Sequence, residues 1–172
     1  MGKTLQTISL LCHLKEREGI HGPSLVICPL SVIYSWCNEL NKWAPSLKFI
    51  RFHSSCESER ETQRKTIIDN ATELDVIITT YEMAKSPNLT SLFRRQHFNL
   101  LVLDEGHKIK NEKSQISQAV RAIHRENAMI LTGTPLQVSV CYFNLIVSLT
   151  NQLLTIKCPE QLGRTVLALV FP

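Results

Sequence analysis

The first residues of the chain that could do chemistry are Gly2, Lys3 and Thr4, directly before apolar residues at helical spacing. They match the second half of the phosphate-binding pattern G-x-x-x-x-G-K-[ST], and the place of its first glycine precedes residue 1. In such a loop backbone N–H groups face the phosphates, the lysine neutralises the β and γ oxygens, and the hydroxyl binds Mg²⁺. We expect a nucleotide site here; an ordinary exposed Lys-Thr pair at a helix start is the alternative.

Two adjacent acids, Asp104 and Glu105, close the apolar run over residues 98–105. In open α/β sheets ligands bind beyond the carboxyl ends of the strands, so both carboxylates would project into a nucleotide crevice. We expect Asp104 to hold Mg²⁺ through its water shell and Glu105 to orient and deprotonate the attacking water. The alternative is a solvated acid pair at a strand end, and the Gly-Lys-Thr upstream favours the catalytic interpretation.

A third segment, "ILTGTPLQ" at 130–137, is another apolar run that leads into small hydroxylated residues. Thr132 and Thr134 could hydrogen-bond to a neighbouring strand end and relay the state of the γ-phosphate from His107. By itself a TGTP sequence is also typical of an ordinary turn after a strand.

Apolar runs alternate with helical patterns along the chain, and this alternation predicts βαβ units with a parallel sheet covered on both faces. The chain is therefore expected to have an α/β fold. The patterns predict strands over 24–31, 47–53, 74–80, 98–105 and 128–135, and helices over 5–14, 31–43, 57–69 and 114–124. Trp36 and Trp43, seven residues apart, are expected on the core face of the second helix.

Composition sets mild limits on the class of protein. The 172 residues suffice for one domain, and a net charge of +4 permits an anionic partner without requiring one. The six cysteines show no zinc or redox spacing, which favours free intracellular thiols. No signal peptide or membrane-spanning run is visible, so we expect an intracellular, soluble protein.

Five segments together resemble motifs I, Ia, Ib, II and III of the SWI/SNF-related helicase-like ATPases, in order and at ordinary spacing. The segments are "MGKTLQTISLL", "LVICPLSVIYSW", "DVIITTYEM", "LLVLDEGHKIKN" and "MILTGTPLQ", and the resemblance covers residues 1–137. It implies the N-terminal RecA-like lobe of an ATP-driven translocase on double-stranded DNA, usually a nuclear chromatin remodeller that acts on nucleosomes. The subfamily stays open.

The resemblance also implies roles for individual residues. Glu105, Asp104 and Lys3 would be catalytic, with Thr4 and Asp104 at Mg²⁺. ATP would contact Gly2, Lys3, Thr4, Asp104, Glu105 and His107. DNA would contact Pro29, Leu30, Ser31, Thr79 and Thr80. Lys108 and Lys110 add positive charge after motif II and are predicted to contact DNA phosphates, with a solvated basic helix start as the alternative. Such contacts fit sequence-independent tracking, because phosphates carry most of the affinity and none of the base information.

The two ends of the chain depart from the family pattern. The first strand of the lobe, which leads into the phosphate loop, is missing, and residues 138–172 do not continue the motifs. We hypothesise that this tail is translated intron. Because a second lobe that supplies an arginine is absent from this chain, we expect it to be inactive alone.

Two other functions stay open at this point. One is a fragment of a DEAH-type RNA helicase, which duplex DNA would not stimulate in preference to RNA. The other is a truncated product that binds DNA or a partner protein without turnover.

Overall fold

The computed structural model describes residues 2–70, 73–86, 91–93, 95–109, 111 and 113–131, and two short strands near the C-terminus. In the described part of the chain no helix is long and apolar enough to span a membrane. The main elements are α1 (Lys3–Glu16), β1 (Ser24–Cys28), η1 (Leu30–Val32), α2 (Ile33–Trp43), β2 (Phe49–Phe52), α3 (Glu57–Asp69), β3 (Val76–Thr80), α4 (Tyr81–Ala84), β4 (Phe98–Asp104), η2 (Gly106–Ile109), α6 (Gln115–Arg121) and β5 (Arg125–Leu131). The two C-terminal strands, β6 (Thr155–Lys157) and β7 (Leu167–Leu169), form a separate antiparallel pair.

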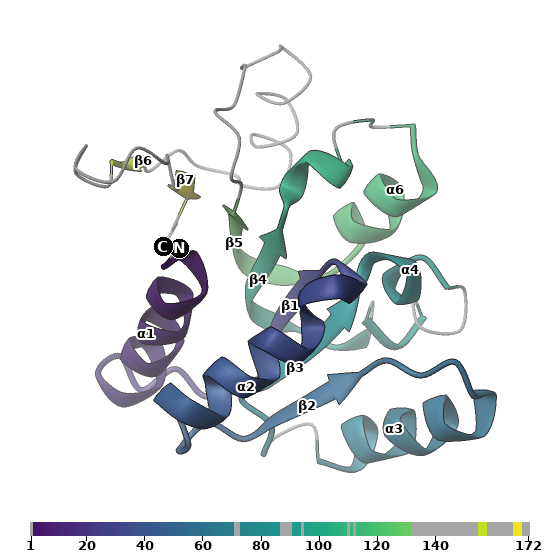
Figure 1. Ribbon diagram of the computed structural model, residues 1–172, viewed down its shortest axis with the longest axis horizontal. Coiled ribbons are helices and arrows are strands. Elements are labelled where there is room, and N and C mark those ends of the chain that lie inside the picture. The colour runs from purple at the N-terminus through teal and green to yellow at the C-terminus, as the bar shows by residue number, and fades with distance from the viewer. Residues whose placement is uncertain are drawn as a thin grey trace.

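Five strands form one sheet in the order β2-β3-β1-β4-β5, and every neighbouring pair is parallel (Figure 1). Because the strands are parallel, their carboxyl ends meet at one edge of the sheet. This edge brings together the ends of β1, β3 and β4, which are Cys28, Thr80 and Asp104. The arrangement confirms the predicted α/β class.

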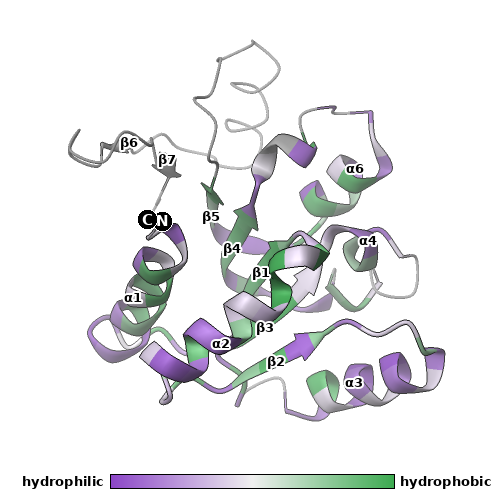
Figure 2. Ribbon diagram, viewed as in Figure 1, coloured by the Kyte–Doolittle hydropathy of each residue, from purple (hydrophilic) through white to green (hydrophobic). Residues whose placement is uncertain are grey.

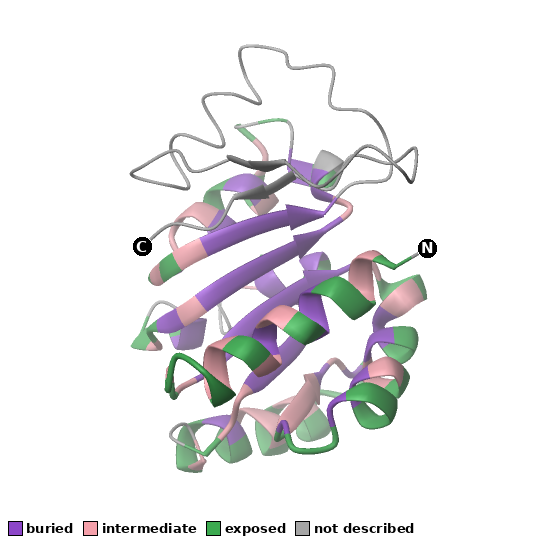
Figure 3. Cartoon of the chain, turned by 90° about the vertical axis from the view of Figure 1, so that its left-hand side faces the viewer, coloured by how far each residue is buried: buried purple, intermediate pink, exposed green. Residues whose placement is uncertain are grey.

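Alternate residues of the central strands enter two separate cores. On β1, Leu25 and Ile27 pack with α3, α4 and α6, whereas Val26 and Cys28 pack with α1 and α2. Figure 2 shows the apolar strands between more polar helices, and Figure 3 shows that the buried residues follow the strands. Helices therefore cover both faces, as the unbroken apolar runs of buried parallel strands predict.

The strand ends differ from the sequence-based prediction where local chemistry stops the strand. The strand expected to reach residue 31 ends at Cys28, because Pro29 is followed by the 3₁₀ turn η1. The strand expected to include Glu105 ends at Asp104, since the φ of Glu105 is 55°. The sequence did not predict α4, whose first turn is capped by the Thr80 hydroxyl accepting from the backbone N–H of Met83 at 3.3 Å.

Near the end of the described sheet, α6 is shorter and β5 begins earlier than predicted. The helix expected to reach residue 124 ends at Arg121, and β5 begins at Arg125 rather than at 128. Polar residues at the start of β5 hid the strand, because the prediction relied on apolar runs. Of the predicted strand, residues 132–135 lie outside the described part of the chain.

Only one of the two tryptophans of α2 lies in the core. Trp36 is 1% exposed, whereas Trp43 is 52% exposed, so the prediction for Trp43 was wrong. Trp43 is the last residue of α2 and stands beyond Leu40, the last α2 residue in the core. It lines a surface pocket together with Leu5 of α1, which is 39% exposed.

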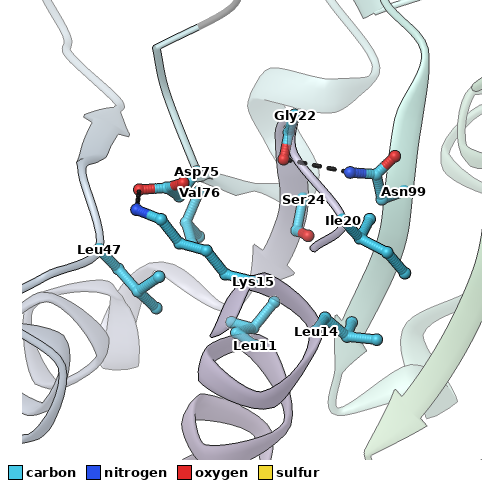
Figure 4. A pocket seen from close by; sticks show the side chains of 10 residues that line it. All are labelled: Leu11, Leu14, Lys15, Ile20, Gly22, Ser24, Leu47, Asp75, Val76 and Asn99. Atoms are coloured by element: carbon cyan, nitrogen blue, oxygen red, sulfur yellow. Dashed lines mark hydrogen bonds and ion pairs between the residues drawn. The ribbon is translucent and has the colours of Figure 1, made fainter. Parts of the chain in front are cut away.

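An ion pair connects α1 to the start of β3 at the amino edge of the sheet. The Lys15 ammonium donates to the Asp75 carboxylate at 2.7 Å, and the backbone N–H of Lys48 donates to the same oxygen at 2.7 Å. Figure 4 shows both charged groups beside a small pocket, which Asn99 also lines while its amide donates to the Gly22 carbonyl. These bonds fix the end of α1 that lies away from Gly2.

We expect Asp75→Ala to destabilise the protein by about 1–3 kcal/mol, because it removes both hydrogen bonds from a carboxylate that is only 14% exposed. Urea denaturation measures this change. The matched control is Glu73→Ala in the neighbouring Lys48–Glu73 pair, in which both side chains are 65% exposed. That control should change the free energy of unfolding by less than about 0.5 kcal/mol. Equal effects of the two substitutions would contradict a stabilising role of the two hydrogen bonds that Asp75 accepts.

Candidate functional site

The candidate site centres on Asp104, whose side chain and backbone are both held by buried aromatic residues. The indole Nε1–H of Trp36 donates to Asp104 Oδ2 at 2.9 Å, and the Tyr81 hydroxyl donates to the Asp104 backbone oxygen at 2.8 Å. Asp104 is 8% exposed, so its carboxylate is more enclosed than a solvated acid at a strand end would be. This geometry favours a positioned functional group over the solvated alternative.

Lys3 and Glu105 meet although they lie far apart in the sequence. Lys3 Nζ is 3.1 Å from Glu105 Oε1, with the side chains 21% and 33% exposed. Glu105 directly follows β4 and adopts a left-handed φ of 55°, which is uncommon for a residue other than glycine. The structure therefore brings together Lys3, Asp104 and Glu105, the three residues expected to be catalytic.

Among the described residues, the N-terminus of α1 is uncovered where phosphates would approach. Gly2 has a φ of 124°, which L side chains rarely adopt, and apart from its chain neighbours no described atom lies within 4 Å of the place where its Cβ would be. No described side chain caps α1 and its first turn has no acid, so this end of the 14-residue helix suits an anion. Thr4 is half-buried in that first turn. An ammonium, a hydroxyl and two carboxylates at one helix end fit a nucleotide phosphate with Mg²⁺.

Several other predicted residues belong to η2 or lie outside the described chain. The backbone of His107 is in η2, but the structure does not describe its side chain. Three further predicted residues lie outside the described part of the chain: Lys110, Thr132 and Thr134. Lys108 is exposed, and its Nζ is 5.7 Å from the centre of the Tyr81 ring. The proposed γ-phosphate relay therefore stays a prediction.

The residues predicted to contact DNA divide into an exposed and a buried group. Leu30 is 49% exposed, Ser31 is exposed and Pro29 is half-buried. Thr79 and Thr80 are 0% exposed, and their hydroxyls bind Phe52 O at 2.9 Å and Met83 N at 3.3 Å. Both threonine side chains are therefore buried in the fold, and their contact with DNA stays a prediction.

Sequence reasoning missed the contacts that Trp36 and Tyr81 make with Asp104. Trp36 was assigned to the core on helical spacing alone, and Tyr81 lies in a helix that was not predicted. The available signal was that buried indole N–H and phenol O–H groups need hydrogen-bond partners. Each of these aromatic side chains finds its partner at the end of β4.

The thiol of Cys28 lies at the same edge of the sheet. Burial raises the pKa of Cys28 to about 12, and the negative charge of Asp104 adds to this effect. The Sγ–H of Cys28 donates to the Thr79 carbonyl at 3.7 Å. At neutral pH this thiol is therefore protonated, and it belongs to the apolar core on the α1 and α2 face of the sheet.

The parallel sheet and the charged cluster at its carboxyl edge define a RecA-like α/β lobe. A family model described as the SNF2-related domain matches residues 1–155. The chain belongs to this family of ATPases. The match to the family model extends beyond residue 137, where the motifs described above end.

Similar proteins carry chromatin-related names. The chain is 43% identical over 137 residues to the human SWI/SNF-related matrix-associated actin-dependent regulator of chromatin subfamily A member 1, covering 80% of this chain and 13% of that protein. It is 43% identical over 139 residues to transcription regulatory protein SNF2 of Saccharomyces cerevisiae, covering 80% and 8%. The chain therefore spans only a small part of these relatives.

A solved structure has the same fold. The Sulfolobus solfataricus SWI2/SNF2 ATPase core in complex with dsDNA matches with a TM-score of 0.72 and 34% identity, over 86% of this chain and 29% of that one. These findings support the SNF2-type assignment and give no support to the DEAH-type RNA helicase alternative.

We expect Gly106→Ala to destabilise the protein by about 1–3 kcal/mol, because a Cβ there would lie 2.3 Å from Ile130 Cγ2. Urea denaturation measures the loss. Adding Ile130→Leu, which removes that γ-methyl group, should restore part of the stability. An alanine variant as stable as the parent would show that Gly106 is not tightly packed.

Alkylation should separate the thiols by environment. Because only the thiolate reacts, Cys28, with a pKa of about 12, should stay unmodified by iodoacetamide at pH 7.5. Of the four cysteines that the structure describes, exposed Cys56 should react first, since hydrogen bonding by Ser58 lowers the pKa of its thiol. Mass spectrometry of the peptides measures both rates, with urea-unfolded protein as the control. Equal alkylation rates of Cys28 and Cys56 in the folded chain would contradict the burial of the Cys28 thiol.

Proposed function

We propose that this chain is the ATP-binding part of the first RecA-like lobe of a DNA-dependent ATPase that translocates on double-stranded DNA. The observation that carries the proposal is the Lys3–Glu105 ion pair beside Asp104, at the N-terminus of α1, where no described side chain caps the helix. Membership of the SNF2-related family supports the nucleotide, and the neighbour solved with dsDNA supports the second ligand.

The proposed chemistry divides among the charged residues. Lys3 leaves Glu105 and neutralises the β and γ oxygens of ATP, while the backbone N–H groups after Gly2 receive the phosphates. Thr4 and Asp104 would hold Mg²⁺, which when bound neutralises the phosphate charge. Once released from Lys3, Glu105 accepts the proton of the attacking water. The ion pair thus represents the resting arrangement of the two side chains.

DNA binding is proposed at the exposed η1 turn and at Lys108. Leu30 and Ser31 follow the carboxyl end of β1 and are exposed, which suits contact with a phosphate. The names of the relatives support a role at chromatin, and hence double-stranded DNA or nucleosomes as partners and the nucleus as location.

Hydrolysis is proposed to depend on a second RecA-like lobe, because an arginine that meets the γ-phosphate charge contributes about 10³–10⁵ in rate. Without that lobe, this segment would bind nucleotide and DNA without turnover. A lobe without its second half would correspond to the alternative function, a product that binds DNA or a partner protein without turnover. The translated-intron origin of residues 138–172 stays a hypothesis, which an uninterrupted coding exon across Gln137 would contradict.

The test compares Lys3→Ala and Glu105→Gln in a protein in which this lobe is joined to a second one. Lys3→Ala should weaken ATP binding at least about tenfold, because it removes a charge-assisted contact. Glu105→Gln should retain binding and lower the hydrolysis rate by about 10²–10⁴, because the amide cannot accept the proton. Calorimetry and phosphate release measure the two properties. Normal hydrolysis by the glutamine variant would contradict the assigned role.

A further inference from the structure

The two hydrogen bonds on Asp104 come from opposite layers of the fold. Trp36 belongs to α2, which packs on one face of the sheet, and Tyr81 belongs to α4, which packs on the other. Both are among the most buried residues, with exposures of 1% and 0%. Neither residue is part of the charged cluster of Lys3 and Glu105. Their polar atoms nevertheless meet at the residue expected to face Mg²⁺.

We propose that Trp36 and Tyr81 are positioning residues, which hold the Asp104 carboxylate and backbone so that the carboxylate oxygen Oδ1 faces the metal. The inference rests on the proposed function, because it requires Asp104 to act at a Mg²⁺–nucleotide. Oδ2 is occupied by the indole of Trp36, the one hydrogen bond that the described residues give to this carboxylate.

The chemistry of the indole suits this task. Its N–H can only donate, so it stabilises an ionised carboxylate and orients Oδ2 without competing for the metal. The carboxylate of Asp104, a residue that is 8% exposed, needs such a donor, since a buried charge without one is costly. Groups that orient a metal-associated residue in this way typically change metal affinity about 10–100-fold when they are removed.

Tyr81 fixes the backbone on the other side of the same residue. The pairing of β1 with β4 ends at Ile27 and Leu103, and the Tyr81 hydroxyl binds the next carbonyl, that of Asp104. Directly after this carbonyl, Glu105 turns to a φ of 55°. The hydroxyl therefore holds the peptide group that sets the directions of both carboxylates.

The chain offers a matched control for each aromatic residue. Trp36→Phe keeps a buried ring and removes the N–H, while Trp43→Phe makes the same change at a residue that is 52% exposed. Likewise Tyr81→Phe removes only the buried hydroxyl, and Tyr34→Phe removes a hydroxyl from a side chain that is 60% exposed. Circular dichroism and urea denaturation show whether each variant is folded under the binding conditions.

The first measurement is ADP affinity by calorimetry, with Mg²⁺ and with EDTA. Trp36→Phe and Tyr81→Phe should weaken Mg²⁺–ADP binding about tenfold and change ADP binding in EDTA by less than about twofold. The two controls should match the parent. A purely structural role would weaken binding in both solutions. That result, or unchanged Mg²⁺–ADP affinity in the folded Trp36→Phe variant, would overturn the inference.

A second measurement leaves Trp36 in place. The sequence has two tryptophans, so in the Trp43→Phe protein the fluorescence comes from Trp36 alone. Mg²⁺–ADP should shift its emission, ADP in EDTA should not, and Asp104→Asn should abolish the shift. Emission that responds equally with and without Mg²⁺, or that does not respond at all, would overturn the inference even if Trp36→Phe does not fold.

The Asp104→Asn variant also separates this inference from the proposed function. If Asp104→Asn weakens Mg²⁺–ADP binding while Trp36→Phe does not, only the positioning role is wrong. If Asp104→Asn leaves the affinity unchanged, Asp104 is not at the metal, and both proposals are overturned.

Discussion

The negative charge of Asp104 lies at the boundary between an apolar sheet and solvent, and it requires a hydrogen-bond donor there. Trp36 supplies that donor from α2, and Tyr81 binds the adjacent backbone oxygen from α4. Because these helices cover opposite faces, the end of β4 is held from both sides. Glu105 follows one residue further and pairs with Lys3.

The parallel sheet brings the other charged residues of the site close to Asp104. Parallel strands place all their carboxyl ends at one edge, and the packing of Ile8 and Leu11 of α1 against the sheet brings Lys3 to that edge. There Lys3 forms an ion pair with Glu105. The Lys15–Asp75 pair holds the other end of α1 at the opposite edge, so the direction of the helix is set at both ends.

The threonines at the end of β3 illustrate how a motif can serve the fold. Thr79 and Thr80 stand in a segment that resembles a DNA-contacting motif, and in the structure each hydroxyl makes a hydrogen bond to the backbone. Thr80 caps the short helix that carries Tyr81. The hydroxyl of that tyrosine in turn binds the Asp104 carbonyl, so the segment also supports the end of β4.

The sequence by itself determined the α/β class, most strand and helix positions, and the residues of the charged cluster. Apolar runs and the chemistry of Gly-Lys-Thr and Asp-Glu are local properties, and residues close in sequence suffice to display them. Only the tertiary structure decided the strand order, the burial of Thr79 and Thr80, the exposure of Trp43, and the partners of Asp104. These features depend on which helix packs over which strand end, and that packing joins residues far apart in the chain, which no local pattern encodes.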